Sequence, residues 1–265
     1  MAKIISVSNQ KGGVGKTTTA INLAASLAFA ERRVLLVDLD PQGNLTSGLG
    51  LKAAAESGQT VYDCLTSPVP NGVSPQLLST AVHGLNLIPA NRGLTGAEIE
   101  LVALPERERR LALMLAPLRE HFDEILIDTP PSLGLLTLNA LVAADAVLIP
   151  LHAEYFALEG LADLVSTLRR VRGSLNPNLD VIGVLLTMHD ERTNLAQAVA
   201  RDIRGFFGEK VFSTVIPRNV RLAEAPSHGM PAILYDVRSR GSEAYVALAR
   251  ELIARERSAS SGVLA

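Results

Sequence analysis

Short apolar segments alternate with longer amphipathic segments along the whole chain. The short segments are rich in Val, Ile and Leu, and most are apolar on both faces. That pattern is typical of strands in a parallel sheet that helices cover on both sides. The predicted strands are Ile4–Ser8, Val34–Asp38, Leu85–Pro89, Glu124–Asp128, Ala146–Leu151, Val181–Thr187 and Val211–Ile216.

The segments between these strands carry apolar residues at helical spacing. The predicted helices are Thr17–Ala30, Arg107–His121, Glu159–Val171, Leu195–Phe207 and Glu243–Arg257. A further buried helix precedes the strand at Ala146, within the most apolar stretch of the chain. Asp145 and Pro150 interrupt that stretch, which argues against a membrane span. The alternation predicts an α/β fold with a single doubly wound, mostly parallel sheet and helices on both faces.

No linker or repeat divides the chain. We therefore expect one domain over residues 1–257 and a flexible tail over residues 258–265, where small polar residues predominate. The polar segment Leu51–Pro75 is expected to rise above the sheet with one short helix. An ordinary surface loop and a functional lid remain open alternatives for it.

Composition narrows the class of protein. The chain has 265 residues, of which 48% are hydrophobic and only 4% aromatic, so its core must consist mainly of aliphatic side chains. A single cysteine, Cys64, excludes a disulfide framework within one chain and fits a cytoplasmic protein. The net charge of −2 excludes a globally basic nucleic-acid binder, although it leaves room for a local basic patch.

The turn after the first strand has the composition of a phosphate-binding loop. Its sequence is Gln10-Lys11-Gly12-Gly13-Val14-Gly15-Lys16-Thr17-Thr18. Glycines let successive backbone N–H groups face phosphate oxygens, and the following helix adds the positive end of its dipole. We expect ATP to bind at residues 11–18, with Lys16 at the β- and γ-phosphates and Thr17 at Mg²⁺. Gln10 replaces the glycine that usually begins such a loop.

Two other strands end in carboxylates that would lie at the same edge of the sheet. Asp128 follows an apolar strand, and we expect it to hold Mg²⁺ through water. Asp40 follows the second strand and is expected to orient a water molecule toward the γ-phosphate. Asp38 is its main competitor, because alternate residues of a strand face the same side.

Lys11 distinguishes this loop from ordinary phosphate loops. The run Lys-Gly-Gly-x-Gly-Lys-Thr resembles the deviant Walker A group of ATPases, which includes ParA/Soj partition proteins, MinD proteins, nitrogenase iron proteins and arsenite-pump ATPases. The resemblance implies that Lys11 crosses a dimer interface to the nucleotide of the partner. A single cysteine disfavours the nitrogenase and arsenite branches, which need more thiols.

Late segments resemble the chromosomal ParA/Soj proteins in particular. The resemblance extends from Ile4 to about Arg250 and includes Leu186–Asn194 and Ile216–Gly229. It implies that Pro217 and Asn219 border adenine and that ATP drives homodimerisation. It also implies non-specific binding to double-stranded DNA, association with the nucleoid in the ATP state, and slow hydrolysis until a ParB/Spo0J-like centromere-binding partner stimulates it.

The C-terminal third contains the side chains that could contact DNA. We expect contacts from Arg192, Arg218 and Arg221, while the remaining candidates are Arg201, Arg204, Lys210, Arg238 and Arg240. Acidic neighbours leave a salt-bridged surface as the alternative. The alternative function is a membrane-associated, MinD-like regulator of cell division, but no lysine-rich amphipathic helix ends the chain, so no membrane partner is expected.

Overall fold

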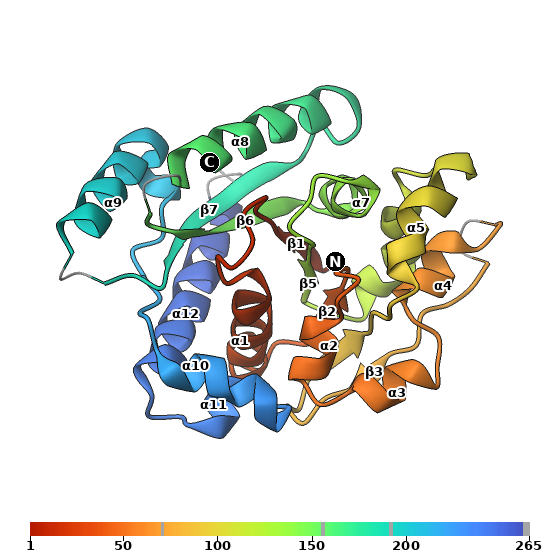
Figure 1. Ribbon diagram of the computed structural model, residues 1–265, viewed down its shortest axis with the longest axis horizontal. Coiled ribbons are helices and arrows are strands. Elements are labelled where there is room, and N and C mark those ends of the chain that lie inside the picture. Colours follow the sequence, from red (N-terminus) through yellow and green to blue (C-terminus); the bar gives the residue numbers. More distant parts are fainter. Residues whose placement is uncertain (70–71, 155–156, 191–192, 262–265) are drawn as a thin grey trace.

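A computed structural model describes residues 1–69, 72–154, 157–190 and 193–261 (Figure 1). At its centre lies a seven-stranded sheet with the order β3-β4-β2-β5-β1-β6-β7. The strands are β1 (Lys3–Val7), β2 (Val34–Asp38), β3 (Leu78–Ser79), β4 (Leu85–Ile88), β5 (Glu124–Asp128), β6 (Ala146–His152) and β7 (Asp180–Thr187). Neighbouring strands pair in parallel except β3 and β4, which confirms the predicted mostly parallel sheet.

Helices cover both faces of the sheet (Figure 1). One face packs against α4 (Val61–Thr66), α5 (Leu94–Glu100), α6 (Arg110–Leu115), α7 (Leu135–Ala143), α8 (Ala157–Ser174) and α9 (Asn194–Phe207). The other packs against α1 (Lys16–Phe29), α2 (Asn44–Gly48), α10 (Val220–Glu224), α11 (Ala232–Tyr235) and α12 (Arg240–Ser261). The short helix α3 (Lys52–Glu56) follows α2. No helix in the described ranges is long and apolar enough to cross a membrane.

The register of the central strands places the ends of three strands side by side. β5 lies between β1 and β2, and Asp128 is level with Val7 on one side and with Asp38 on the other. All three strands run in the same direction, so their carboxyl ends share one edge of the sheet. The loop that leads from β1 into α1 begins at this edge.

The predicted strand over Val211–Ile216 is wrong. Only Val211 forms an isolated bridge there, with Val184 of β7. The N–H groups of Ser213 and Thr214 donate instead to the Glu251 carboxylate of α12, at 2.8 and 2.9 Å. The N–H groups of Phe212 and Ile216 still donate to the Val184 and Leu186 carbonyls of β7, but Glu251 takes the Thr214 N–H between them, so no continuous ladder forms and the sheet ends at β7.

Other elements differ from prediction in their limits. The helix expected over Arg107–His121 begins at Arg110 and changes at Ala116 into a 3₁₀ helix, because Pro117 cannot donate a backbone hydrogen bond. The segment Leu51–Pro75 contains α3 and α4 rather than one helix, and α4 buries Cys64 and Leu65 in the core. Helix α12 continues past Arg257 to Ser261, while the flexible tail remains a prediction.

Asn139 offers a test of how α7 is joined to its neighbours. Its buried side chain accepts a hydrogen bond from the Leu111 N–H (3.1 Å) and donates to the Arg107 carbonyl (2.7 Å). Asn139→Ala leaves both backbone groups unpaired and should lower the free energy of unfolding by about 3 kcal/mol. Urea denaturation measures this change. Asn86→Ala, which removes a long 3.5 Å contact at the sheet edge, should lower the free energy of unfolding by less than about 1 kcal/mol. Equal losses of stability in the two variants would contradict the role given to Asn139.

Candidate functional site

The glycine-rich turn between β1 and α1 forms a loop at the carboxyl edge of the sheet. Gly13 and Gly15 have φ values of 72° and 85°, in the left-handed region that favours glycine. Helix α1 starts directly after Gly15, so its free N-terminal N–H groups face the space enclosed by the loop. The backbone therefore has the form of the predicted anion cradle.

Neighbouring strands hold this loop in place through two side chains. Asn9 accepts the Lys11 N–H at 3.0 Å and donates to the Pro150 carbonyl at the end of β6 at 2.8 Å. The Thr187 hydroxyl, at the end of β7, donates to the Val14 carbonyl at 2.8 Å. Neither role was predicted from the sequence. The role of Asn9 could have been predicted locally, because an Asn two residues before Lys11 can form an Asx turn. The role of Thr187 could not, because only the packing of β7 against the loop brings it close to Val14.

The two lysines of the loop occupy different environments. Lys16 is buried, and its ammonium donates to the Lys11 carbonyl at 3.1 Å. Burial lowers the pKa of Lys16, and the nearby Asp128 and Asp40 carboxylates partly oppose that change. The Lys11 ammonium is half-buried at the surface and pairs with Glu154 at 2.8 Å. Lys16 is therefore placed for a ligand inside the loop, while Lys11 lies at its outer rim.

Thr17 and Asp128 form the predicted metal-binding pair. The Thr17 hydroxyl donates to Asp128 Oδ2 at 2.7 Å. Asp128 is fully buried, and its Oδ1 has no hydrogen-bond partner within the part of the chain that the structure describes. Burial raises the pKa of Asp128 well above its usual value, and the Asp38 carboxylate raises it further. A hydroxyl and an unsatisfied carboxylate oxygen fit Mg²⁺, which prefers oxygen ligands and would stabilise the ionised form.

Asp38 and Asp40 differ in their hydrogen-bond donors and in their burial. Asp38 is fully buried and accepts hydrogen bonds from the Thr46 N–H (2.9 Å) and hydroxyl (2.7 Å). Burial raises the pKa of Asp38 to about 6. Asp40 is 8% exposed and accepts a bond from the Gln42 N–H at 2.9 Å. Asp38 thus anchors α2, while Asp40 lies beyond the strand end and nearer to solvent.

The segment around Pro217 is docked beside the end of β7. The Ile216 N–H donates to the Leu186 carbonyl at 2.8 Å, and the His189 N–H donates to the Ile216 carbonyl at 3.0 Å. A cavity of about 660 Å³ opens here, lined by His189, Asp190, Val215, Pro217, Arg218, Val220 and Arg240. Asn219 is not part of that lining. Its side-chain oxygen accepts the Arg221 N–H at 2.9 Å and caps α10.

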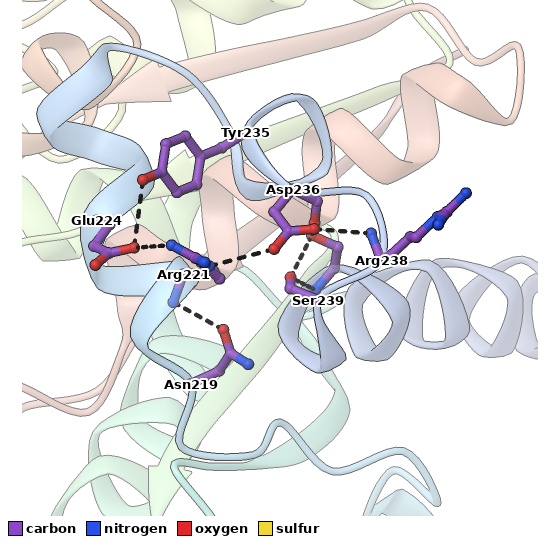
Figure 2. A network of polar contacts seen from close by, with 8 residues as sticks. Asn219, Arg221, Glu224, Tyr235, Asp236, Arg238 and Ser239 are labelled. Carbon is purple, nitrogen blue, oxygen red and sulfur yellow. Dashed lines mark hydrogen bonds and ion pairs between the residues drawn. The ribbon is translucent and has the colours of Figure 1, made fainter.

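The predicted DNA-contacting arginines that the structure describes, Arg218 and Arg221, have different surroundings. Arg192 lies outside the described residues. Arg218 is exposed at the cavity beside Pro217. Arg221 pairs with Glu224 at 2.8 Å and with Asp236 at 3.3 Å, as Figure 2 shows. The structure thus brings the loop, Asp40 and Asp128 together, and leaves Arg221 in a separate network at α10.

Comparisons with known proteins identify the family of this chain. A family model described as an AAA domain matches residues 2–181. The chain is 56% identical over 256 residues to the chromosome partitioning protein ParA of Myxococcus xanthus, covering 97% of this chain and 89% of that protein. It is also 56% identical over 254 residues to the sporulation initiation inhibitor protein Soj of Bacillus subtilis, covering 96% of this chain and 99% of that protein.

A solved structure has a similar fold over nearly the whole chain. Cobyrinic acid a,c-diamide synthase from Mycobacterium smegmatis superposes with a TM-score of 0.83 at 37% identity, covering 98% of this chain and 97% of that one. That protein was solved with bound ADP and magnesium, and also with an ATP analogue and magnesium. Together with the near-full-length matches to ParA and Soj, these findings show that the chain belongs to the ParA/Soj family of chromosome-partitioning ATPases.

Proposed function

We propose that this protein is a Mg²⁺-dependent ATPase that dimerises around ATP, binds DNA without sequence preference, and acts in chromosome segregation. The observation that carries the proposal is the grouping of Lys16, Asp40 and the Thr17–Asp128 pair at one edge of the sheet. Lys11 lies at the rim of the same site. The relatives named for chromosome partitioning favour this function over the MinD-like alternative.

Binding and hydrolysis divide between different residues. The loop N–H groups and the Lys16 ammonium hold the phosphates, and Pro217 and Asn219 border the adenine. Thr17 and Asp128 would hold Mg²⁺, Asp128 through water, and the cation would offset negative charge on the β- and γ-phosphates. Asp40 orients the attacking water, for which it has the exposure that Asp38 lacks.

Dimerisation places residues of each protomer beside the other protomer's nucleotide. Lys11 leaves Glu154 and reaches the partner's phosphates, which are a stronger counter-charge than one exposed carboxylate. Gly12 lies at the point where the two loops approach each other. It is exposed, so its surface is free to meet a second copy.

The dimer gives ATP control over DNA binding. Two modest basic surfaces, one from each protomer, bind together more tightly than either does alone. Arg192, Arg218 and Arg221 contribute to this surface. A ParB/Spo0J-like protein bound to centromere-like DNA stimulates hydrolysis, which dissolves the dimer and releases it from DNA. The protein is cytoplasmic and associates with the nucleoid while ATP is bound.

Lys16→Ala tests the nucleotide site. Loss of the buried ammonium removes the charge that neutralises the β- and γ-phosphates, so ATP affinity should fall by at least about 100-fold. Titration calorimetry with ATP and Mg²⁺ measures the change. Lys52→Ala removes an exposed lysine on α3 and serves as the matched control, with unchanged affinity expected. Wild-type affinity in Lys16→Ala would overturn the site.

Gly12→Val tests the dimer without disturbing the chain itself. A Cβ at Gly12 would meet only the Pro131 Cβ among the described residues, at 4.0 Å, so the monomer should fold and bind ATP normally. The branched side chain should then block the approach of a second loop. Light scattering with ATP should find a monomer for Gly12→Val and a weakened dimer for Gly12→Ala. An undiminished dimer in Gly12→Val would refute the face-to-face arrangement.

Asp40→Ala separates binding from hydrolysis. It should bind ATP, dimerise and stay on DNA, while phosphate release falls at least about 100-fold because the water is no longer oriented. Asp40→Asn retains an acceptor for the Gln42 N–H and should behave in the same way. Asp38→Ala should instead destabilise the fold, because Thr46 loses two hydrogen bonds. Hydrolysis at the wild-type rate by either Asp40 variant would exclude the proposed role.

A further inference from the structure

Arg221 is held by acidic side chains from two different elements. Its Nη1 donates to Glu224 on α10, one turn along the same helix, and its Nε lies 3.3 Å from Asp236, directly after α11. The guanidinium also lies 5.9 Å from the centre of the Tyr235 ring, and the Tyr235 hydroxyl is 3.4 Å from Glu224. Figure 2 shows Arg221 between the two carboxylates.

The charges of this network do not favour a DNA phosphate. Arg221 contributes one positive charge, whereas Glu224 and Asp236 contribute two negative charges, so the three side chains carry a net charge of −1. The Arg221 side chain is 49% exposed and could therefore be reached from solvent. In this arrangement, however, its charge is already more than neutralised.

We propose that Glu224 and Asp236 form an autoinhibitory latch that holds Arg221 away from the phosphate backbone of DNA. DNA binding through Arg221 then requires exchange of at least one carboxylate for a phosphate. The proposal rests on the DNA binding proposed above and adds to it the element that limits affinity. Glu224 and Asp236 act on DNA through Arg221 and have no DNA contact of their own.

The latch can open without rearrangement of the backbone. The Asp236 carbonyl is held by the Ser242 hydroxyl at 2.8 Å and by the Ser239 N–H at 3.1 Å. Asp236 Oδ1 also accepts the Arg238 N–H at 3.2 Å. These contacts do not involve Arg221, so they persist when its side chain rotates away. Because exposed ion pairs contribute at most about 1 kcal/mol, a phosphate can compete with them.

Arg238 shows the contrasting arrangement within the same network. Its backbone N–H bonds Asp236, but its exposed side chain points away from the two carboxylates (Figure 2). Arg221 is therefore distinguished from its neighbour by the direction of its side chain, which lies over Tyr235 and between two acids. The pairing is a property of this position and is not shared by every basic residue of the segment.

The test measures binding of the full-length variants to a DNA duplex by fluorescence anisotropy, with ATP and Mg²⁺, across a salt series. Glu224→Gln and Asp236→Asn should each tighten binding by at least about threefold at low salt. The loss of affinity between about 50 and 200 mM salt should grow by about threefold for each Arg221 that gains a phosphate. The double variant should bind DNA more tightly than either single variant does.

A matched control separates the latch from a general change of charge. Glu243→Gln removes an exposed carboxylate from the first turn of α12, in the same part of the chain. It should leave the salt dependence close to that of the wild type. In an Arg221→Ala background, measured at low salt where other basic residues retain binding, Glu224→Gln should no longer tighten the complex. A salt dependence of Glu224→Gln and Asp236→Asn equal to that of Glu243→Gln would overturn the latch.

The wild-type protein distinguishes failure of this inference from failure of the proposed function. If the wild type and both neutralised variants bind no DNA with ATP, DNA binding itself is refuted. If the wild type binds DNA and the neutralised variants bind it equally, only the latch is refuted. Thermal melting and ATP titration should give wild-type values for the variants, since both carboxylates lie at the surface away from the phosphate loop.

Discussion

The parallel pairing of β5 with β1 on one side and β2 on the other is the constraint on which the rest of the site depends. It makes Asp128 level with Val7 and with Asp38, so the phosphate loop and two carboxylates meet at one sheet edge. A slip of one residue would turn each of these side chains to the opposite face. The buried aliphatic residues on both faces of β5 oppose such a slip, because they are packed against helices on both sides.

This edge concentrates charge in a region that excludes water. Burial favours the neutral forms of Asp38, Asp128 and Lys16, although each lies close to an opposite charge or to hydrogen-bond donors. Among the residues that the structure describes, no group forms a hydrogen bond with the buried Asp128 Oδ1. A phosphate with its cation would supply what is missing, since it adds negative charge beside Lys16 and positive charge beside Asp128.

Unlike the buried charges of the site, two cations at the surface are paired with carboxylates of the same chain. Lys11 pairs with Glu154, and Arg221 pairs with Glu224 and Asp236, so two cations important to the proposed function are neutralised within the chain. A net charge of −2 is consistent with such internal pairing. Because exposed ion pairs are weak, they can exchange partners at little cost, as the proposed function requires of Lys11 and Arg221.

The sequence by itself determined most of the alternating strands and helices, the glycine-rich loop and the carboxylates at or just after the ends of β2 and β5. These features depend on neighbouring residues: apolar runs, glycine conformations and the fixed direction of parallel strands. It also predicted ATP and Mg²⁺ from the types of residue in the loop and the strand ends. The local sequence pattern was sufficient to predict these features.

Only the tertiary structure decided which distant groups are partners. Glu251, far along the chain, takes the donors of Ser213 and Thr214 and prevents the strand predicted at Val211–Ile216. Thr46, eight residues further along the chain, donates two hydrogen bonds to Asp38, and neither of these contacts follows from the alternation of side chains along the strand. Asp236 likewise joins Arg221 only because α11 folds back beside α10. Local propensity acts over a few residues, whereas the pairing of polar groups depends on which elements the packed core brings into contact.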